Sequence, residues 1–162
     1  MDAAIRLFRE DDAAALAALT VAAIRAIGAR AYSPDQVAGW AARHTDAARF
    51  CTRAKAGDTI LVAADGDDAA CAYAVLEPDG HLDMLYCHPD HAGHGLAAAL
   101  LAAAEQQARA AGGKRLFTEA SELARPVFAR AGYVLLHRRD FTIPHAGRAI
   151  AIHNYAMEKL LG

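Results

Sequence analysis

The stretch LDMLYCHPDHAGHGLA, residues 82–97, holds a strand, a loop and a helix start in succession. It begins with apolar residues in a pattern typical of a strand, and it ends in a leucine- and alanine-rich run typical of a helix. The loop between them carries Gly93 and Gly95, which permit close approach of a ligand and unusual φ angles. Such a loop points free backbone N–H groups and a helix N-terminus at one place, which favours anions. The stretch therefore predicts an anion site, and a plain strand-to-helix turn is the alternative.

The same loop lacks the two common glycine motifs of nucleotide-binding proteins. No Gly-Lys-Ser/Thr follows it, and no G-x-G-x-x-G occurs in it. A P-loop and a dinucleotide-binding fingerprint are therefore both excluded.

Outward from this stretch, the chain alternates between strands and helices. We expect strands at residues 4–8, 59–63, 70–76, 81–87, 114–119, 134–142 and 150–158. We expect helices from Asp11 or Asp12 to about residue 30, from Ser33-Pro34 onward, at 46–55, at 96–111 and from Ser121 to 130. Short turns make residues 59–87 an antiparallel meander, and a helical crossover places 114–119 beside 81–87. The expected fold is α/β: one domain over residues 1–162, with a mixed, mostly antiparallel sheet of about seven strands and helices on both faces.

The composition of the chain excludes some classes of function. The chain has 162 residues and a formal net charge of −2, so it lacks the positive charge that a nucleic-acid-binding protein needs. Its three cysteines are widely spaced and form no CxxC, which favours a reduced, cytoplasmic setting. We expect no signal peptide, because no basic segment followed by an apolar run begins the sequence. We expect no membrane span either, because the most apolar helix is far shorter than the ~20 residues required.

Two motifs carry a resemblance to a known family. The segments Leu85-Tyr86-Cys87-His88-Pro89 and Gly95-Leu96-Ala97 resemble the acyl-CoA-binding motif of the GNAT superfamily of N-acetyltransferases. In that family a strand ending in L-x-V-x-P leads into (Q/R)-x-x-G-x-(G/A) at a helix start. Residues 129–133, ARAGY, resemble the family's Y-e-k-x-G-F after the next helix. The order of elements fits over essentially the whole chain.

A narrower resemblance is to the bacterial YafP-type branch of this superfamily, whose acceptors are poorly defined. It rests on residues 32–40 (YSPDQVAGW), 83–86 (DMLY), 119–121 (EAS), 125–128 (RPVF) and 154–159 (NYAMEK).

The resemblance implies direct transfer of an acetyl group from acetyl-CoA to a primary amine, carried by a small molecule or a peptide. It implies a V-shaped gap between strands 81–87 and 114–119 that receives the cosubstrate, and it implies no metal. Pantetheine amides would pair with backbone near Leu85 and Cys87, and a strand N–H near Leu85 or Tyr86 would stabilise the oxyanion. The pyrophosphate would rest on the loop formed by Gly93, His94, Gly95, Leu96 and Ala97.

The sequence departs from the family pattern at two positions. Ala92 stands where the family has Gln or Arg, so pyrophosphate binding rests on backbone N–H groups from Gly93 to Ala97, with help from His94. Phe128 stands where a Tyr often protonates the departing sulfur. We expect Phe128 to be an apolar wall for pantetheine, and Ser121 to bond the cosubstrate, to donate a proton or only to cap its helix.

Two residues are candidates for the general base that deprotonates the amine. Period-two alternation places His81, Asp83, Leu85 and Cys87 on one face of the strand. His81 aligns with a position where some family members carry a Glu base, whereas Asp83 is nearer the thioester. A kink would swap the faces, so both stay candidates; the alternatives are a surface histidine and a buried structural carboxylate.

Other residues of the acceptor region are given structural roles. Glu119 is expected to shape the acceptor site or to pair with Arg125. Trp40 is expected in the core and His44 in solvent, beside Tyr32 on the early helices.

Three competing hypotheses remain. His88, His91 and His94 have a spacing that suggests zinc, although exposed loop histidines are favoured. Cys87 suggests a covalent acetyl-cysteine, although inert packing is favoured. A non-catalytic acyl-CoA sensor or interaction domain is the main alternative to an enzyme, and a homodimer is left open.

Overall fold

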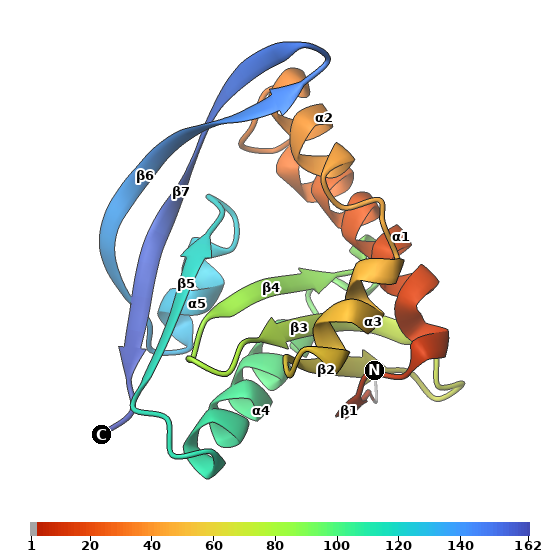
Figure 1. Ribbon diagram of the computed structural model, residues 1–162, viewed down its shortest axis with the longest axis vertical. Helices are drawn as coiled ribbons and strands as arrows, with labels where there is room; N and C mark the ends of the chain where they lie inside the picture. The colour runs from red at the N-terminus through yellow and green to blue at the C-terminus, as the bar shows by residue number, and fades with distance from the viewer. Residues whose placement is uncertain (1–2) are drawn as a thin grey trace.

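A computed structural model describes residues 3–162, and within them it has seven strands in two sheets (Figure 1). The first sheet is an antiparallel meander of β1 (Ala4–Leu7), β2 (Thr59–Ala64), β3 (Ala70–Leu76) and β4 (Leu82–Cys87), in that order. The second sheet has the order β5-β7-β6, formed by β5 (Arg115–Ala120), β6 (Val134–His145) and β7 (Arg148–Leu160). The predicted fold class, the antiparallel meander and the final strand pair are confirmed, with the correction that the strands divide between two sheets.

Helices cover both faces of the first sheet. The α-helices of the described residues are α1 (Ala13–Ala23), which continues as a π-helical turn at Ile24–Gly28, α2 (Pro34–Ala42), α3 (Ala48–Lys55), α4 (Leu96–Ala110) and α5 (Arg125–Arg130). Of these, α1, α3 and α4 pack on the first sheet, whereas α2 and α5 contact the last hairpin. Helices α1 and α3 bury Leu16 and Phe50 against one face, and α4 buries Leu100 and Leu101 against the other. The expected helices on both faces are confirmed.

The helix starts agree with the sequence in one case and differ in another. Ser33 caps α2, since its Oγ accepts a hydrogen bond from Gln36 N at 3.2 Å. Asp12, by contrast, does not cap α1 with its side chain. Its carboxylate instead accepts from Arg9 N at 2.8 Å and from both terminal nitrogens of Arg6, which ties the helix start to β1.

A β-bulge at Asp83 interrupts the alternation of β4. Leu82 lies opposite Leu76 and Met84 lies opposite Val75, so Asp83 is an extra residue with no partner on β3. Leu82 packs on the α4 side of the sheet, whereas Met84 packs on the α1 side. The expectation that His81, Asp83, Leu85 and Cys87 share one face is therefore wrong, because the bulge moves Leu85 and Cys87 to the α4 side.

Within residues 3–162, the two sheets pair with each other only at the start of β4. His81 forms a parallel bridge with Phe117, and Thr118 Oγ1 donates to Leu82 O at 2.7 Å. Gly80 is required at this apex, because a Cβ atom there would lie 2.1 Å from Arg115 O. Beyond the apex, β4 and β5 have no further pairing among residues 3–162, and they diverge in Figure 1. The expected V-shaped gap is present.

The last hairpin is longer than expected. A two-residue turn of Ala146 and Gly147, both with positive φ, joins β6 to β7, so pairing continues to His145 and Arg148. The tip of the hairpin arches over α2 (Figure 1), where Ile143 approaches Gly39. This arch closes the space above the gap.

Candidate active site

Two cavities lie on the two sides of β4. The central cavity, about 400 Å³, is bounded by α2, α3, β4, β5, β6 and β7. The α4 groove, about 580 Å³, runs from the start of α4 to α5. The central cavity takes Asp83, Leu85 and Phe128 among its lining residues, and the α4 groove takes Cys87.

The loop before α4 has the geometry of an anion site. Gly93 and Gly95 adopt φ of 81° and 76°, a left-handed conformation that favours glycine. The first bond of α4 runs from Ala99 N to Gly95 O at 3.1 Å, so residues 96–98 have no intrahelical acceptor for their N–H groups. Of the predicted loop residues, Gly93, Gly95, Leu96 and Ala97 line the α4 groove, as does Ala92. The remaining one, His94, is exposed and is not among the lining residues.

The edge of β4 offers backbone groups to the gap. His88 N donates to Cys71 O at 2.8 Å, and this bond shows which residues of β4 direct their backbone groups towards β3. Antiparallel strands alternate paired and outward-facing residues, so the N–H and C=O groups of Leu85 and Cys87 point away from β3. Because β4 has diverged from β5 here, these groups face the gap. The Tyr86 ring lies on the central-cavity side, opposite to α4.

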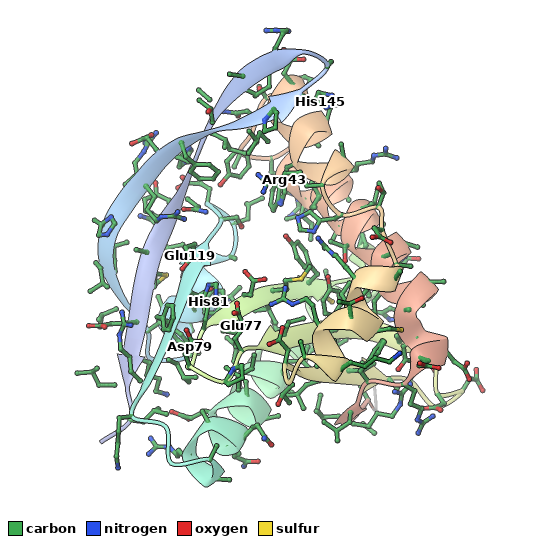
Figure 2. All side chains as sticks on the ribbon, viewed as in Figure 1. Arg43, Glu77, Asp79, His81, Glu119 and His145 are labelled. Carbon is green, nitrogen blue, oxygen red and sulfur yellow. The ribbon has the colours of Figure 1, made fainter. Side chains whose placement is uncertain are left out.

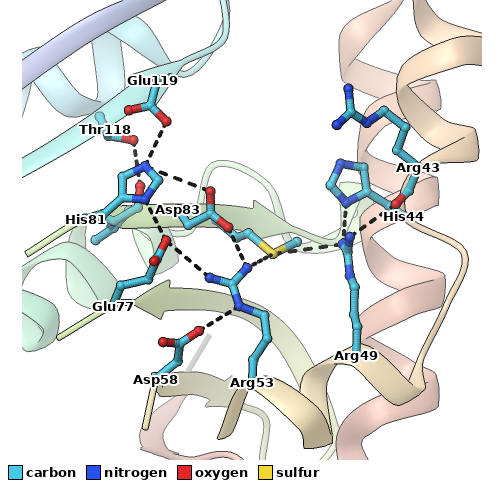
Figure 3. Close-up of polar contacts among 12 residues, drawn as sticks. Arg43, His44, Arg49, Arg53, Asp58, Glu77, His81, Asp83, Thr118 and Glu119 are labelled. Atoms are coloured by element: carbon cyan, nitrogen blue, oxygen red, sulfur yellow. Dashed lines mark hydrogen bonds and ion pairs between the residues drawn. The ribbon is translucent and has the colours of Figure 1, made fainter. Parts of the chain in front are cut away.

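His81 is held by two carboxylates. Its Nδ1 lies 2.6 Å from Glu77 Oε1, and its Nε2 lies 2.7 Å from Glu119 Oε1 (Figure 3). These hydrogen bonds, that to Glu119 first, outweigh burial and raise the pKa of His81 to about 9. At neutral pH the ring is an imidazolium with both N–H groups engaged. It therefore has no free nitrogen with which to accept a proton.

Asp83 projects from the bulge into the central cavity. Its Oδ2 accepts from Arg53 Nη1, and its Oδ1 lies 3.9 Å from His81 Nε2. Arg53 is shared, because its Nε also donates to Asp58 Oδ2 at 2.7 Å. The side chain of Asp83 is one-third exposed (33%), so the alternative of a buried carboxylate bound by backbone is wrong.

Glu119 has a more central place in the site than the sequence predicted. It lines the central cavity and pairs with His81, whereas Arg125 lies near Glu122 at 3.8 Å and over the ring of Tyr155. Of the two alternatives for Glu119, pairing with Arg125 is therefore wrong. Alternation along β5 was the available signal, since Thr118 and Ala120 are buried and Glu119 points the other way.

A basic group faces this acidic one across the cavity. Arg43, His44 and Arg49 lie on the opposite side from His81 and Glu119 in Figure 3. His44 Nδ1 contacts Arg49 Nη2. Burial first, and then the charges of Arg49 and Arg43, lower the pKa of His44 to about 4. His44 is thus a half-buried neutral residue of the cavity, and its expected place in solvent is wrong.

Aromatic side chains also line the central cavity. Trp40 Nε1 donates to Tyr86 Oη at 3.3 Å, and both residues line the central cavity with Tyr32 and Phe141. Tyr32 Oη accepts from Glu122 N at 2.8 Å and donates to His153 O at 3.0 Å. It thereby fixes the loop after β5 against β7.

Three further predicted residues have clear surroundings. Ser121 Oγ accepts from Ala124 N at 3.2 Å, one turn before α5, and Ser121 lines the central cavity. Phe128 is 2% exposed and packs edge-on against Tyr133, with ring centroids 5.0 Å apart. Burial raises the pKa of the Cys87 thiol to about 11, which keeps it protonated and disfavours an acetyl-cysteine.

The metal hypothesis finds little support in the loop histidines. Within residues 3–162, ligand atoms within 4.8 Å of one another occur at Glu77, His81 and Asp83, and not at the histidine triplet. Arg53 already occupies the space beside two of these carboxylates. The same described residues contain no helix long and apolar enough to cross a membrane.

Comparison with known proteins decides the family. The acetyltransferase (GNAT) domain family matches residues 28–142. A GCN5-related N-acetyltransferase from Rhodopseudomonas palustris is 36% identical, with 99% of this chain and 97% of that one covered and a TM-score of 0.86. The chain belongs to the GNAT acetyltransferase family. The predicted superfamily and acyltransferase class are therefore confirmed.

More distant structures share the fold. The PaiA N-acetyltransferase of Thermoplasma acidophilum, in complex with coenzyme A, is 15% identical with a TM-score of 0.79, and 99% of this chain and 100% of that one are covered. A phosphinothricin acetyltransferase of Sinorhizobium meliloti, in complex with acetyl-CoA, is 20% identical with a TM-score of 0.73. The match covers 100% of this chain and 90% of that one. Comparison with curated proteins finds no match to this chain.

Proposed function

We propose that this GNAT protein transfers the acetyl group of acetyl-CoA to a primary amine by direct attack, within a ternary complex. The observation that carries the proposal is the position of β4 between two cavities, one beside a built anion loop and one lined by carboxylates. This arrangement gives the cosubstrate and the acceptor separate approaches to one strand edge.

The cosubstrate is assigned to the α4 groove and the gap. Its pyrophosphate would accept hydrogen bonds from the N–H groups of Gly93 to Ala97, because Ala92 offers no polar side chain. Its pantetheine arm would pair with the outward backbone groups of Leu85 and Cys87. The ring of Phe128 would pack against that arm from α5.

Asp83 is assigned as the general base. An ammonium has no lone pair, so a carboxylate at the cavity must take the proton, directly or through one water. Asp83 fits because the bulge directs it into the cavity, and Glu119 is the second candidate because it lines the same wall. The N–H of Leu85 would stabilise the oxyanion, because the N–H of Tyr86 points towards β3. Ser121 and water remain the candidates for protonating the thiolate.

His81 takes a different role from the one first expected. As an imidazolium bound at both nitrogens, it positions Glu119 and Glu77 and places positive charge near Asp83. We therefore assign it as a positioning residue and not as the base.

Thiol release from acetyl-CoA in the presence of amine panels tests the function. Amine-dependent release with formation of the N-acetyl product supports an enzyme. Tight acetyl-CoA binding without release for any amine would favour the non-catalytic sensor. The YafP-type branch, the cytoplasmic location and a homodimer stay predictions of the sequence.

A further inference from the structure

The central cavity carries opposite charges on facing walls. Its acidic wall comprises Asp83 from β4 and Glu119 from β5, and its basic wall comprises Arg43, just after α2, and Arg49 from α3. Figure 2 places Glu119 and His81 on the sheet side and Arg43 beside α2. A third arginine, Arg139, lines the cavity from β6.

The acidic wall has an excess of negative charge. Glu77, Asp83 and Glu119 surround two cations, Arg53 and the imidazolium of His81. Arg53 is shared further with a carboxylate outside the cavity. An ammonium group that entered the cavity would therefore be attracted to this side.

The basic wall lacks any such compensation. Among residues 3–162, no carboxylate lies within ion-pair distance of Arg43, Arg49 or Arg139. Arg49 donates to Arg43 O at 3.1 Å, and its Nε is buried without a hydrogen-bond partner. Arg139 donates to Asn154 Oδ1 at 3.0 Å, a neutral acceptor. Neutral His44 contributes no charge of its own.

The cavity also has apolar lining. Its apolar side chains include Trp40, Tyr86, Phe141 and Ile152. The volume of about 400 Å³ lies at the small end of ligand pockets, which suits a compact molecule. A ligand that matches all of these features has an amine, an apolar body and an anionic group.

We propose that the acceptor is a primary amine that also carries a carboxylate: a free amino acid with an apolar side chain, or a close relative. Its amine lies toward Asp83 and Glu119, and its carboxylate lies on Arg43. A guanidinium binds a carboxylate through two parallel hydrogen bonds, which fixes orientation as well as affinity. The inference rests on the proposed function, since it names the acceptor of the same site.

Matched pairs of acceptors test the substrate class. Phenylalanine, leucine and methionine are each compared with the corresponding decarboxylated amine: phenethylamine, 3-methylbutylamine and 3-(methylthio)propylamine. For at least one pair we expect kcat/KM for the amino acid to exceed that for its amine by about tenfold or more. Equal or better use of the decarboxylated amine in every pair would overturn the proposal.

A binding measurement separates this proposal from the proposed function. Calorimetric titration of phenylalanine and phenethylamine into protein saturated with coenzyme A repeats the comparison without turnover. If the amino acid binds more tightly but no amine is acetylated, the proposed acetyltransferase activity is wrong and the proposed recognition of a carboxylate stands. If amines are acetylated with no preference for a carboxylate, the acetyltransferase activity stands and the proposed acceptor class is wrong.

Three arginine variants test the placement of the carboxylate. Arg43→Gln is expected to lower kcat/KM for the best amino acid by about tenfold or more, and to lower it less for the decarboxylated amine. Arg30→Gln, at an exposed arginine outside the cavity, is the matched control and should leave both values unchanged. Loss in Arg139→Gln without loss in Arg43→Gln would overturn the assignment to Arg43.

Discussion

The Nε2 atom of His81 lies 2.7 Å from Oε1 of Glu119, and this contact joins the two sheets beside the bridge of His81 with Phe117. His81 also stacks on Phe117, with ring centroids 4.8 Å apart. The imidazolium thus stabilises the apex of the gap on which the proposed active site depends. Its charge state links the stability of the fold to pH.

We predict that the protein loses stability between about pH 6.5 and pH 9. The pKa of His81 is raised in the folded state from 6.5 to about 9, because Glu119 and Glu77 bind the charged ring. The resulting stabilisation is fully present below the unfolded pKa and disappears as pH rises through the folded pKa. Denaturant unfolding across this range measures it.

The His81→Gln variant provides the comparison for this prediction. Its free energy of unfolding should be lower than that of the parent at pH 6. Between pH 6 and pH 9 its free energy of unfolding should fall less than that of the parent. His94→Gln, at an exposed histidine, is the control and should follow the parent curve. An unchanged decline in His81→Gln would assign the pH dependence to other groups.

The sequence predicted most of the architecture because each local signal agreed with its neighbours. Gly93 and Gly95 marked a loop, Ser33-Pro34 marked a helix start, and short turns marked the meander. A kink in β4 was allowed for, but the bulge could not be placed at Asp83, because ideal alternation assumes unbroken pairing. The available signal was Asp83 itself, the single charged residue of β4.

Gly95→Glu is predicted to abolish acetyl-CoA binding and leave the fold intact. Gly95 has a positive φ, and a Cβ atom at this position would have no neighbouring atom within 4 Å, so the added side chain meets the ligand and not the protein. Its negative charge opposes the pyrophosphate at the helix N-terminus. Isothermal calorimetry with coenzyme A measures the loss, and circular dichroism checks the fold.

Gly57→Glu is the matched control for backbone strain. Gly57 also has a positive φ and open surroundings, but it lies in the turn before β2. The free energy of unfolding should fall by a similar amount in both variants, and only Gly95→Glu should fail to bind coenzyme A. Normal coenzyme A affinity in folded Gly95→Glu would move the pyrophosphate away from this loop.

Asp83→Asn is predicted to lower kcat by ~10²-fold or more while acetyl-CoA affinity changes little. The amide cannot take the proton of the amine. Asp58→Asn is the matched control, because Asp58 contacts the same arginine and does not line the central cavity. Near-normal turnover in Asp83→Asn with loss in Glu119→Gln would transfer the role of base to Glu119.

Tyr133→Phe is predicted to keep or raise the stability of the free protein, by up to ~1 kcal/mol. Tyr133 is 4% exposed, and its hydroxyl is buried without a hydrogen-bond partner. Removing an unsatisfied polar group costs nothing in the folded state. Denaturant unfolding gives the result, and a loss of more than ~1 kcal/mol would indicate a partner for the hydroxyl, such as an ordered water.

The composition of the central cavity could not be predicted from the sequence. His44, Glu119 and Arg139 come from the loop after α2, from β5 and from β6, which are distant along the chain. Periodicity assigns each side chain to a face of its own element, but the arch of the last hairpin and the divergence of β4 from β5 decide which faces meet. Local patterns do not encode that relationship.

A series at Phe128 tests whether this residue is a wall for pantetheine. Phe128→Ala should destabilise the protein by about 3–5 kcal/mol and weaken acetyl-CoA binding, because a buried aromatic ring is lost. Phe128→Leu should keep most activity, since an apolar side chain of nearly adequate size remains. Phe128→Tyr should be as active as the parent or faster. The thiol of coenzyme A has a pKa near ~8.5, so an added phenol helps its departure without being required. The turnover of the three variants is compared by steady-state thiol release with the best acceptor. A folded Phe128→Tyr enzyme with normal acetyl-CoA affinity and almost no turnover would show that the acceptor, and not the cosubstrate, needs the apolar edge of this ring.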